Sequence, residues 1–89
     1  MKIKLELFGA SRDFSNKDHL EFNIKGQLEI KDFRKEIINY LGKNFKGNES
    51  FIKIVKNSVF CSEDNNIIND DFKIIKDQKI GIIPPIGGG

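Results

Sequence analysis

Cysteine and long apolar runs are both scarce in this sequence. Among the 89 residues there is one cysteine, Cys61, which excludes an internal disulfide and any metal site built from several cysteines. No apolar run is long enough to span a bilayer. The basic start at Met1 and Lys2 leads into alternating residues rather than into the apolar stretch of a signal peptide. We therefore expect a cytoplasmic protein that does not enter a membrane.

An excess of charge of one sign is also missing. The net charge is +2, and lysines are interleaved with acidic residues, so the sequence lacks the basic stripe that nucleic-acid binding requires. Apolar residues make up 38% of the chain and charged residues 31%, which is the balance of a globular rather than a disordered protein. A chain of this length has room for one core, so we expect one small domain.

Two runs of alternating residues open the chain, at residues 2–8 and 19–25. Each run places its apolar side chains on one face, as a half-buried strand does. The polar segment 9–18 between them is predicted to be a loop, so the two runs indicate an antiparallel hairpin. The inward-facing residues are expected to be Ile3, Leu5, Leu7, Leu20, Phe22 and Ile24.

The apolar period then changes to that of a helix. Ile30, Phe33, Ile37 and Leu41 recur at helical spacing. Gly42 follows the last of these positions and is predicted to be the C-cap of the helix. The later part of the chain is expected to form a strand at residues 51–55, a short strand at 59–61, and a last strand at 79–83.

This order of elements predicts an α+β fold. One main helix can cover one face of a mixed sheet and give two layers around a single core. The order is compatible with a β-grasp, in which the first and last strands lie parallel at the centre of the sheet. We divide the chain into a β-grasp domain, residues 1–83, and an extended tail, residues 84–89.

Few side chains inside the domain are candidates for chemistry. His19 lies on the polar side of its strand, and a surface histidine is the favoured interpretation because a catalytic one needs a partner in hydrogen-bond reach. Cys61 has acidic neighbours in Glu63 and Asp64, so we expect a structural thiol rather than a nucleophile. The pair Asp70-Asp71 lacks the spacing of a calcium loop and is expected to be solvated. We expect no metal site and no bound cofactor.

The last six residues are the most unusual stretch of the sequence. Pro84 and Pro85 end the final strand and stiffen the backbone after it, and Ile86 stands alone as an apolar residue. Gly87, Gly88 and Gly89 have no Cβ, so the chain here is as thin as a peptide can be. A frayed terminus without a role is the plain alternative. We favour the hypothesis that the Gly89 carboxylate is the reactive group, activated inside a partner enzyme whose channel excludes side chains.

The tail and the order of elements together resemble the small subunit of molybdopterin synthase, the MoaD-type sulfur carriers of the ubiquitin-like superfamily. The residues that carry the resemblance are Leu7-Phe8-Gly9-Ala10 with Arg12-Asp13, the helix around 30–41, and the whole stretch 75–89. That stretch ends in Pro-Pro, an aliphatic residue, a spacer and Gly-Gly.

The resemblance implies a mechanism and partners. A MoeB-like, E1-like adenylyltransferase would adenylate Gly89 with ATP, and a sulfur donor would then convert it to a thiocarboxylate. The tail would enter the MoaE-like large subunit of molybdopterin synthase and give its sulfur to a pyranopterin precursor. Partner binding would involve Ile83, Pro84, Pro85, Ile86, Gly87 and Gly88. Alternatives are a sulfur carrier for thiamin or tRNA thiolation, a protein modifier conjugated through Gly89, and an interaction module with a passive tail.

Overall fold

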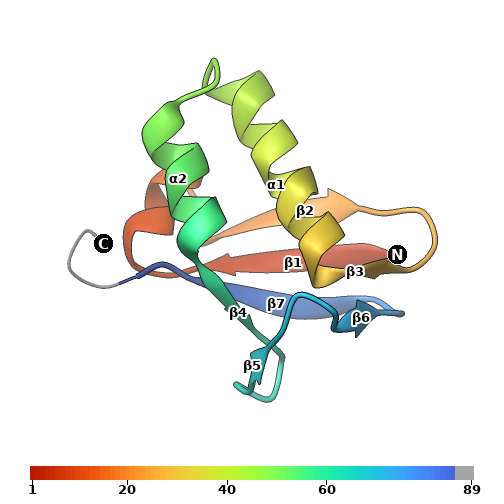
Figure 1. Ribbon diagram of the computed structural model, residues 1–89. Helices are drawn as coiled ribbons and strands as arrows, with labels where there is room; N and C mark the ends of the chain where they lie inside the picture. Colours follow the sequence, from red (N-terminus) through yellow and green to blue (C-terminus); the bar gives the residue numbers. More distant parts are fainter. Residues whose placement is uncertain (86–89) are drawn as a thin grey trace.

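The computed structural model describes residues 1–85 of the chain (Figure 1). A 3-10 helix, η1 (Gly9–Phe14), separates the first two strands, and two α-helices follow, α1 (Ile30–Asn44) and α2 (Glu49–Asn57). The strands are β1 (Lys2–Leu7), β2 (His19–Asn23), β3 (Leu28–Glu29), β4 (Val59–Cys61), β5 (Ile67–Ile68), β6 (Lys73–Ile74) and β7 (Gln78–Ile83). No helix in this part of the chain is long and apolar enough to cross a membrane.

The main sheet has five strands in the order β2-β1-β7-β4-β5. The first strand, β1, pairs with β2 in antiparallel and with β7 in parallel register, while β4 pairs with β7 and β5 in antiparallel register. The two short strands β3 and β6 form a separate small sheet. The sequence-based prediction that the first and last strands lie parallel at the centre is therefore confirmed.

One core lies between the sheet and the helices. Both α-helices cover the same face of the sheet and leave the other face without helices (Figure 1). The predicted inner residues of β1 are fully buried, as are the stripe residues of α1. Phe33 of α1 packs edge-on against Phe22 of β2, with ring centroids 5.4 Å apart, and also against Phe60 of β4. The apolar residues of the alternating strands and those of the helical stripe thus pack together in one cluster.

Three local predictions are wrong. Residues 51–55 belong to helix α2 and not to a strand, and Gly42 lies inside α1, which runs on to Asn44. Part of the segment 9–18 forms η1 instead of a loop. The error at α2 has a physical source: the Asn48 side chain accepts a hydrogen bond from the Phe51 amide at 3.1 Å and so caps a helix start. The main helix is therefore accompanied by a second one.

Candidate functional site

The central strand β7 leads straight to the tail. It is hydrogen-bonded on both sides, by β1 and β4, so its end is held by two neighbouring strands. Ile83 is half-buried, Pro84 is buried and Pro85 is exposed. The predicted tail residues Ile86, Gly87, Gly88 and Gly89 lie outside the described residues, so the role given to them stays a prediction. The structure describes the root of the tail, which we define as Ile83, Pro84 and Pro85.

A glycine from the other end of the chain lies against this root. Gly9 has a positive φ of 55°, a conformation that residues with a Cβ adopt rarely. A Cβ built on Gly9 would lie 3.9 Å from Pro84 Cδ, an ordinary van der Waals contact, so Gly9 is a neighbour of the proline ring. The preceding residue, Phe8, reaches the next part of β7, and its ring edge would be 3.0 Å from a Cβ on Gly81. The turn after β1 therefore contacts β7 and the root together.

An apolar patch spreads from the root over the helix-free face of the sheet. Val59 of β4 lies opposite Ile83 of β7. Cys61 of β4 lies opposite Gly81 on the β7 side and opposite Ile67 on the β5 side. Val59 is 46% exposed and Ile67 61% exposed, so neither is covered by the domain itself. We call the side chains that reach solvent here the outer patch, which consists of Phe8, Val59, Ile67 and Ile83. An exposed apolar patch of this kind is typical of a protein–protein contact.

Charged side chains border the outer patch. Glu6 and Lys79 form an ion pair at 3.5 Å on the same face, and Lys2 pairs with Glu21 at 3.8 Å further from the root. An apolar centre with a polar rim is the usual anatomy of a protein-binding surface. The geometry therefore places a stiff exit point for the chain beside a surface suited to docking.

Comparison with solved structures identifies the architecture. One match is a protein from Pyrococcus furiosus assigned as subunit 1 of the molybdopterin converting factor, with a TM-score of 0.70 and 18% identity. It covers 96% of this chain and 98% of its own. SAMP1 from Haloferax volcanii matches with a TM-score of 0.68 and 11% identity over 100% of both chains. The chain has the β-grasp fold.

No family model and no curated protein sequence matches the chain. At identities of 18% and 11%, the likeness to the two solved structures establishes the fold alone. The fold class predicted from the sequence, an α+β β-grasp with a mixed sheet and one main helix, is confirmed.

Cys61 is a packed thiol of this β-grasp domain. It is 7% exposed, and its Sγ would stand 2.6 Å from a Cβ on Gly81. The sulfur atom therefore fills the space that the missing glycine side chain leaves. This position agrees with the structural role expected for Cys61.

His19 lies away from the root, at the start of β2. Its Nδ1 is 2.9 Å from Asp18 Oδ1, and its Nε2 is 3.6 Å from Glu21 Oε1. The hydrogen bond to His19 holds the pKa of the Asp18 carboxyl below its usual value. The sequence did not predict these carboxylate contacts, but His19 is partly exposed and lies away from the root.

Two acidic residues of the long loop, residues 62–72 between β4 and β6 with the short strand β5 inside it, also have structural partners. Glu63 Oε1 accepts a hydrogen bond from the Lys79 amide at 2.8 Å, and Asp70 Oδ1 accepts one from Arg34 Nη2 at 2.8 Å. Within residues 1–85, no group of three or more His, Cys, Asp or Glu side chains is placed to hold a metal ion. These contacts tie the long loop to β7 and α1.

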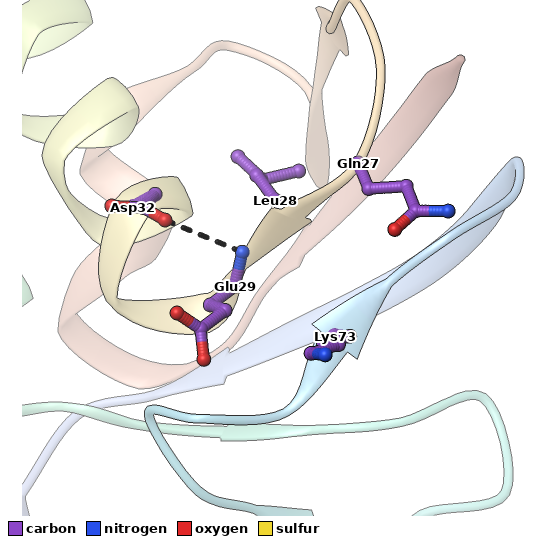
Figure 2. Close-up of a pocket in the computed structure, with 5 residues that line it drawn as sticks. All are labelled: Gln27, Leu28, Glu29, Asp32 and Lys73. Atoms are coloured by element: carbon purple, nitrogen blue, oxygen red, sulfur yellow. Dashed lines mark hydrogen bonds between the residues drawn. The ribbon is translucent and has the colours of Figure 1, made fainter.

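Two surface hollows lie on the β-grasp domain away from the root. Figure 2 shows the first, of about 250 Å³, lined by Gln27, Leu28, Glu29, Asp32 and Lys73. Its Asp32 carboxylate accepts a hydrogen bond from the Glu29 amide at 3.4 Å and so caps the start of α1. The second, of about 290 Å³, borders His19 and Tyr40. Among their polar groups, Glu29 and Asp32 belong to the cap of α1, and His19 and Glu21 form the contact described above.

Sequence reasoning missed three residues that shape the site. Gly9, Phe8 and Val59 contact the root or lie beside it, yet their spacing in the sequence shows no pattern. The proximity depends on the parallel pairing of β1 with β7, which joins residues about 75 positions apart. A glycine directly after a strand is the one sequence signal that could have predicted this turn, in which Gly9 has a positive φ.

Proposed function

We propose that this chain is a sulfur carrier, the small subunit of a molybdopterin synthase. The observation that carries the proposal is the path of β7, the central strand, into a Pro-Pro root followed by Ile-Gly-Gly-Gly. The full-length likeness to a protein assigned as subunit 1 of the molybdopterin converting factor supports it. A rigid strand is a suitable support for a reactive group that must enter a partner's site.

The proposed chemistry takes place on the Gly89 carboxylate. Its oxygen attacks the α-phosphorus of ATP, pyrophosphate leaves, and an acyl-adenylate forms. A hydrosulfide ion released by a donor then attacks the acyl carbon and displaces AMP, which leaves a thiocarboxylate. In the large subunit the thiocarboxylate sulfur attacks a carbon of the pyranopterin precursor and displaces an oxygen leaving group. Water then cleaves the acyl–sulfur bond, so the sulfur stays on the pterin and Gly89 is again a carboxylate. The partners supply ATP, the sulfur donor and the catalytic side chains, while this chain supplies the carrier group.

The outer patch supplies the docking surface in this proposal. The MoeB-like adenylyltransferase and the MoaE-like large subunit must each hold the domain while the tail enters their sites. Val59 lies opposite Ile83, which is itself part of the root, and the two face the same side of the sheet. A partner bound there would sit directly beside the point where the tail leaves the domain.

Intact-mass spectrometry tests the proposal. The protein is incubated with ATP, a MoeB-like enzyme and sulfide, and the expected result is a mass gain equal to the exchange of one oxygen for sulfur. Omitting ATP, or deleting Gly89, should abolish the gain. If the full chain never gains sulfur with a partner that thiocarboxylates its own carrier, the proposal is wrong.

A second candidate function is protein modification through Gly89. SAMP1 matches the chain nearly as well as the first structure does, so the fold does not separate a synthase subunit from other proteins of this architecture. Conjugation would join the Gly89 carboxyl to a lysine amine of a target protein. This candidate predicts high-mass conjugates in cells that express the tagged chain, and their loss when Gly89 is deleted.

A further inference from the structure

The turn after β1 is tied by the hydroxyl of Ser11. This side chain is fully buried, one of two buried polar side chains in the described residues. Its Oγ accepts a hydrogen bond from the Phe8 amide at 3.0 Å and donates one to the Phe8 carbonyl at 2.6 Å. The Ser11 amide donates a third bond to the same carbonyl at 3.1 Å. Three hydrogen bonds therefore fix one residue pair, Phe8 and Ser11, in a single geometry.

The turn that Ser11 closes lies beside the end of β7 at two points. The Phe8 ring lies over Gly81 on the helix-free face, and Gly9 lies beside the buried Pro84, whose ring a Cβ on Gly9 would touch at 3.9 Å. Gly9 has a φ of 55°, so the path of the chain at this point depends on a conformation that glycine adopts readily. Any change in the turn would alter both contacts, since Phe8 and Gly9 are consecutive.

The direction of the chain at Pro84 matters for a group carried beyond it. Five residues, 85–89, follow Pro84, and if a partner held them extended they would span about 17 Å. A tilt of about 10° at the root would then displace the far end by about 3 Å. An error of about 1 Å in the position of a reacting group can reduce a rate by about a hundredfold. Stiffness at the root is therefore a requirement of the proposed chemistry.

We propose that Ser11 is a positioning residue, which acts through Phe8 and Gly9 to fix the direction in which the chain leaves the domain at Pro84. The inference rests on the proposed function for its kinetic consequence. Its structural consequence, the contact between Gly9 and Pro84, can be measured without any partner.

The kinetic test compares Ser11→Ala with Ile74→Val in adenylation by a MoeB-like enzyme. Ile74 is fully buried in β6, at the opposite end of β7 from the root, so its shortening weakens the core without touching the turn (Figure 1). Assays run well below the Tm of each variant. For Ser11→Ala we expect kcat to fall about tenfold because orientation is lost, and KM to rise by less than about threefold because Phe8 is the one residue of the outer patch that the change disturbs. Ile74→Val should keep both constants.

The structural test uses nuclear Overhauser effects between Gly9 Hα and Pro84 Hδ protons. They should be present in the wild type and in Ile74→Val, and lost or strongly weakened in Ser11→Ala. A second pair of variants guards against misfolding of Ser11→Ala. Asparagine tolerates a positive φ and valine does not, so Gly9→Asn should keep kcat within about threefold while Gly9→Val should behave like Ser11→Ala.

Two results would overturn the inference. The first is that Ser11→Ala keeps both the Gly9–Pro84 contact and the wild-type kcat. The second is that Ile74→Val loses as much kcat as Ser11→Ala does, which would show a general effect of stability. If the wild type itself is not adenylated, the proposed function fails, and the positioning role then stands or falls on the Gly9–Pro84 contact in Ser11→Ala.

Discussion

At the scale of single residues, Gly81 has the closest neighbours of the described glycines. It is buried at the centre of the sheet, and a Cβ there would stand 2.6 Å from Cys61 Sγ and 3.0 Å from the Phe8 ring. Real Cβ atoms do not approach other heavy atoms that closely, so either the thiol or the aromatic ring would have to move. Packed interiors transmit such strain instead of absorbing it.

Gly81→Ala should therefore destabilise the domain by about 1–3 kcal/mol, the usual cost of overpacking. Urea unfolding followed by circular dichroism measures the change. The double variant Gly81→Ala with Cys61→Ala should recover part of the loss, because the shorter side chain vacates the space that the new methyl group needs. Strict additivity of the two single effects would contradict this account of the close contact.

Among the elements, some were predictable from the sequence for a clear reason and others were not. The strand β1 and the helix α1 each have one buried face, so their apolar periods of 2 and 3.6 are unmixed. In β7, Ile80 and Ile82 keep the period of 2, although Gly81 between them is also buried. In α2 the run Phe51-Ile52-Lys53-Ile54-Val55 fits both periods and has β-branched residues. Its helical state depends on the Asn48 cap and on packing against α1, which no local pattern reveals.

The candidate site was likewise predictable from the sequence only in part. The Pro-Pro root and the terminal glycines were visible in the sequence as composition. The burial of Pro84 was not, because its neighbour Gly9 comes from the opposite end of the chain. The outer patch could not be predicted from the sequence either. Phe8, Val59 and Ile67 are brought to one surface by three strand pairings, which are β1 with β7, β7 with β4, and β4 with β5.

The position of Gly42 inside α1 gives a prediction at this scale. A built Cβ on Gly42 meets nothing within 4 Å, and its φ is not positive. Gly42→Ala should therefore stabilise the protein by about 0.5–1 kcal/mol, because the alanine chain has less backbone entropy to lose when the helix forms. Thermal unfolding measures the gain. A loss of stability would instead indicate a left-handed C-cap at Gly42, the conformation expected from its place after the apolar stripe.

Arg34 joins α1 to the end of α2 and to the long loop. Its Nη1 donates to the Val55 and Ser58 carbonyl oxygens at 2.7 and 2.8 Å, and Nη2 donates to Asp70 at 2.8 Å. The guanidinium carbon also lies 4.9 Å from the centroid of the Phe60 ring. One guanidinium group thus donates hydrogen bonds to carbonyl oxygens at the end of α2 and links α1, α2 and the long loop.

Arg34→Lys should cost about 2 kcal/mol although the charge is kept, because an ammonium group cannot reach all three oxygen acceptors in the fixed geometry of the guanidinium fork. Urea unfolding gives the free energy of unfolding. Arg12→Lys is the matched control, since Arg12 is exposed and should change stability by less than about 0.5 kcal/mol. Equal effects at the two arginines would rule out this role for Arg34.

At the scale of the whole molecule, the main feature is that the two faces of the sheet differ. The helices cover one face of the sheet and build the core, which leaves the opposite face free for partners (Figure 1). The root of the tail and the outer patch lie together at the end of β7. In the proposed function, docking uses the exposed side chains of the helix-free face, while the core lies under the helices. A change at an exposed residue of that face should therefore alter binding without altering the fold.

Val59→Asp tests this separation. Val59 is 46% exposed, so a carboxylate there stays solvated in the free domain, and the Tm should change little. Binding should weaken at least tenfold, because a partner's apolar surface would have to cover an unpaired charge. Isothermal titration calorimetry with the MoaE-like subunit and with the MoeB-like enzyme measures both affinities. Ile75→Asp is the control: Ile75 is 60% exposed in the segment before β7, far from the root, and should leave both affinities unchanged. If Val59→Asp binds both partners as tightly as the wild type does, the outer patch is not the docking surface, and the partners must recognise this chain by its tail or by its helical face.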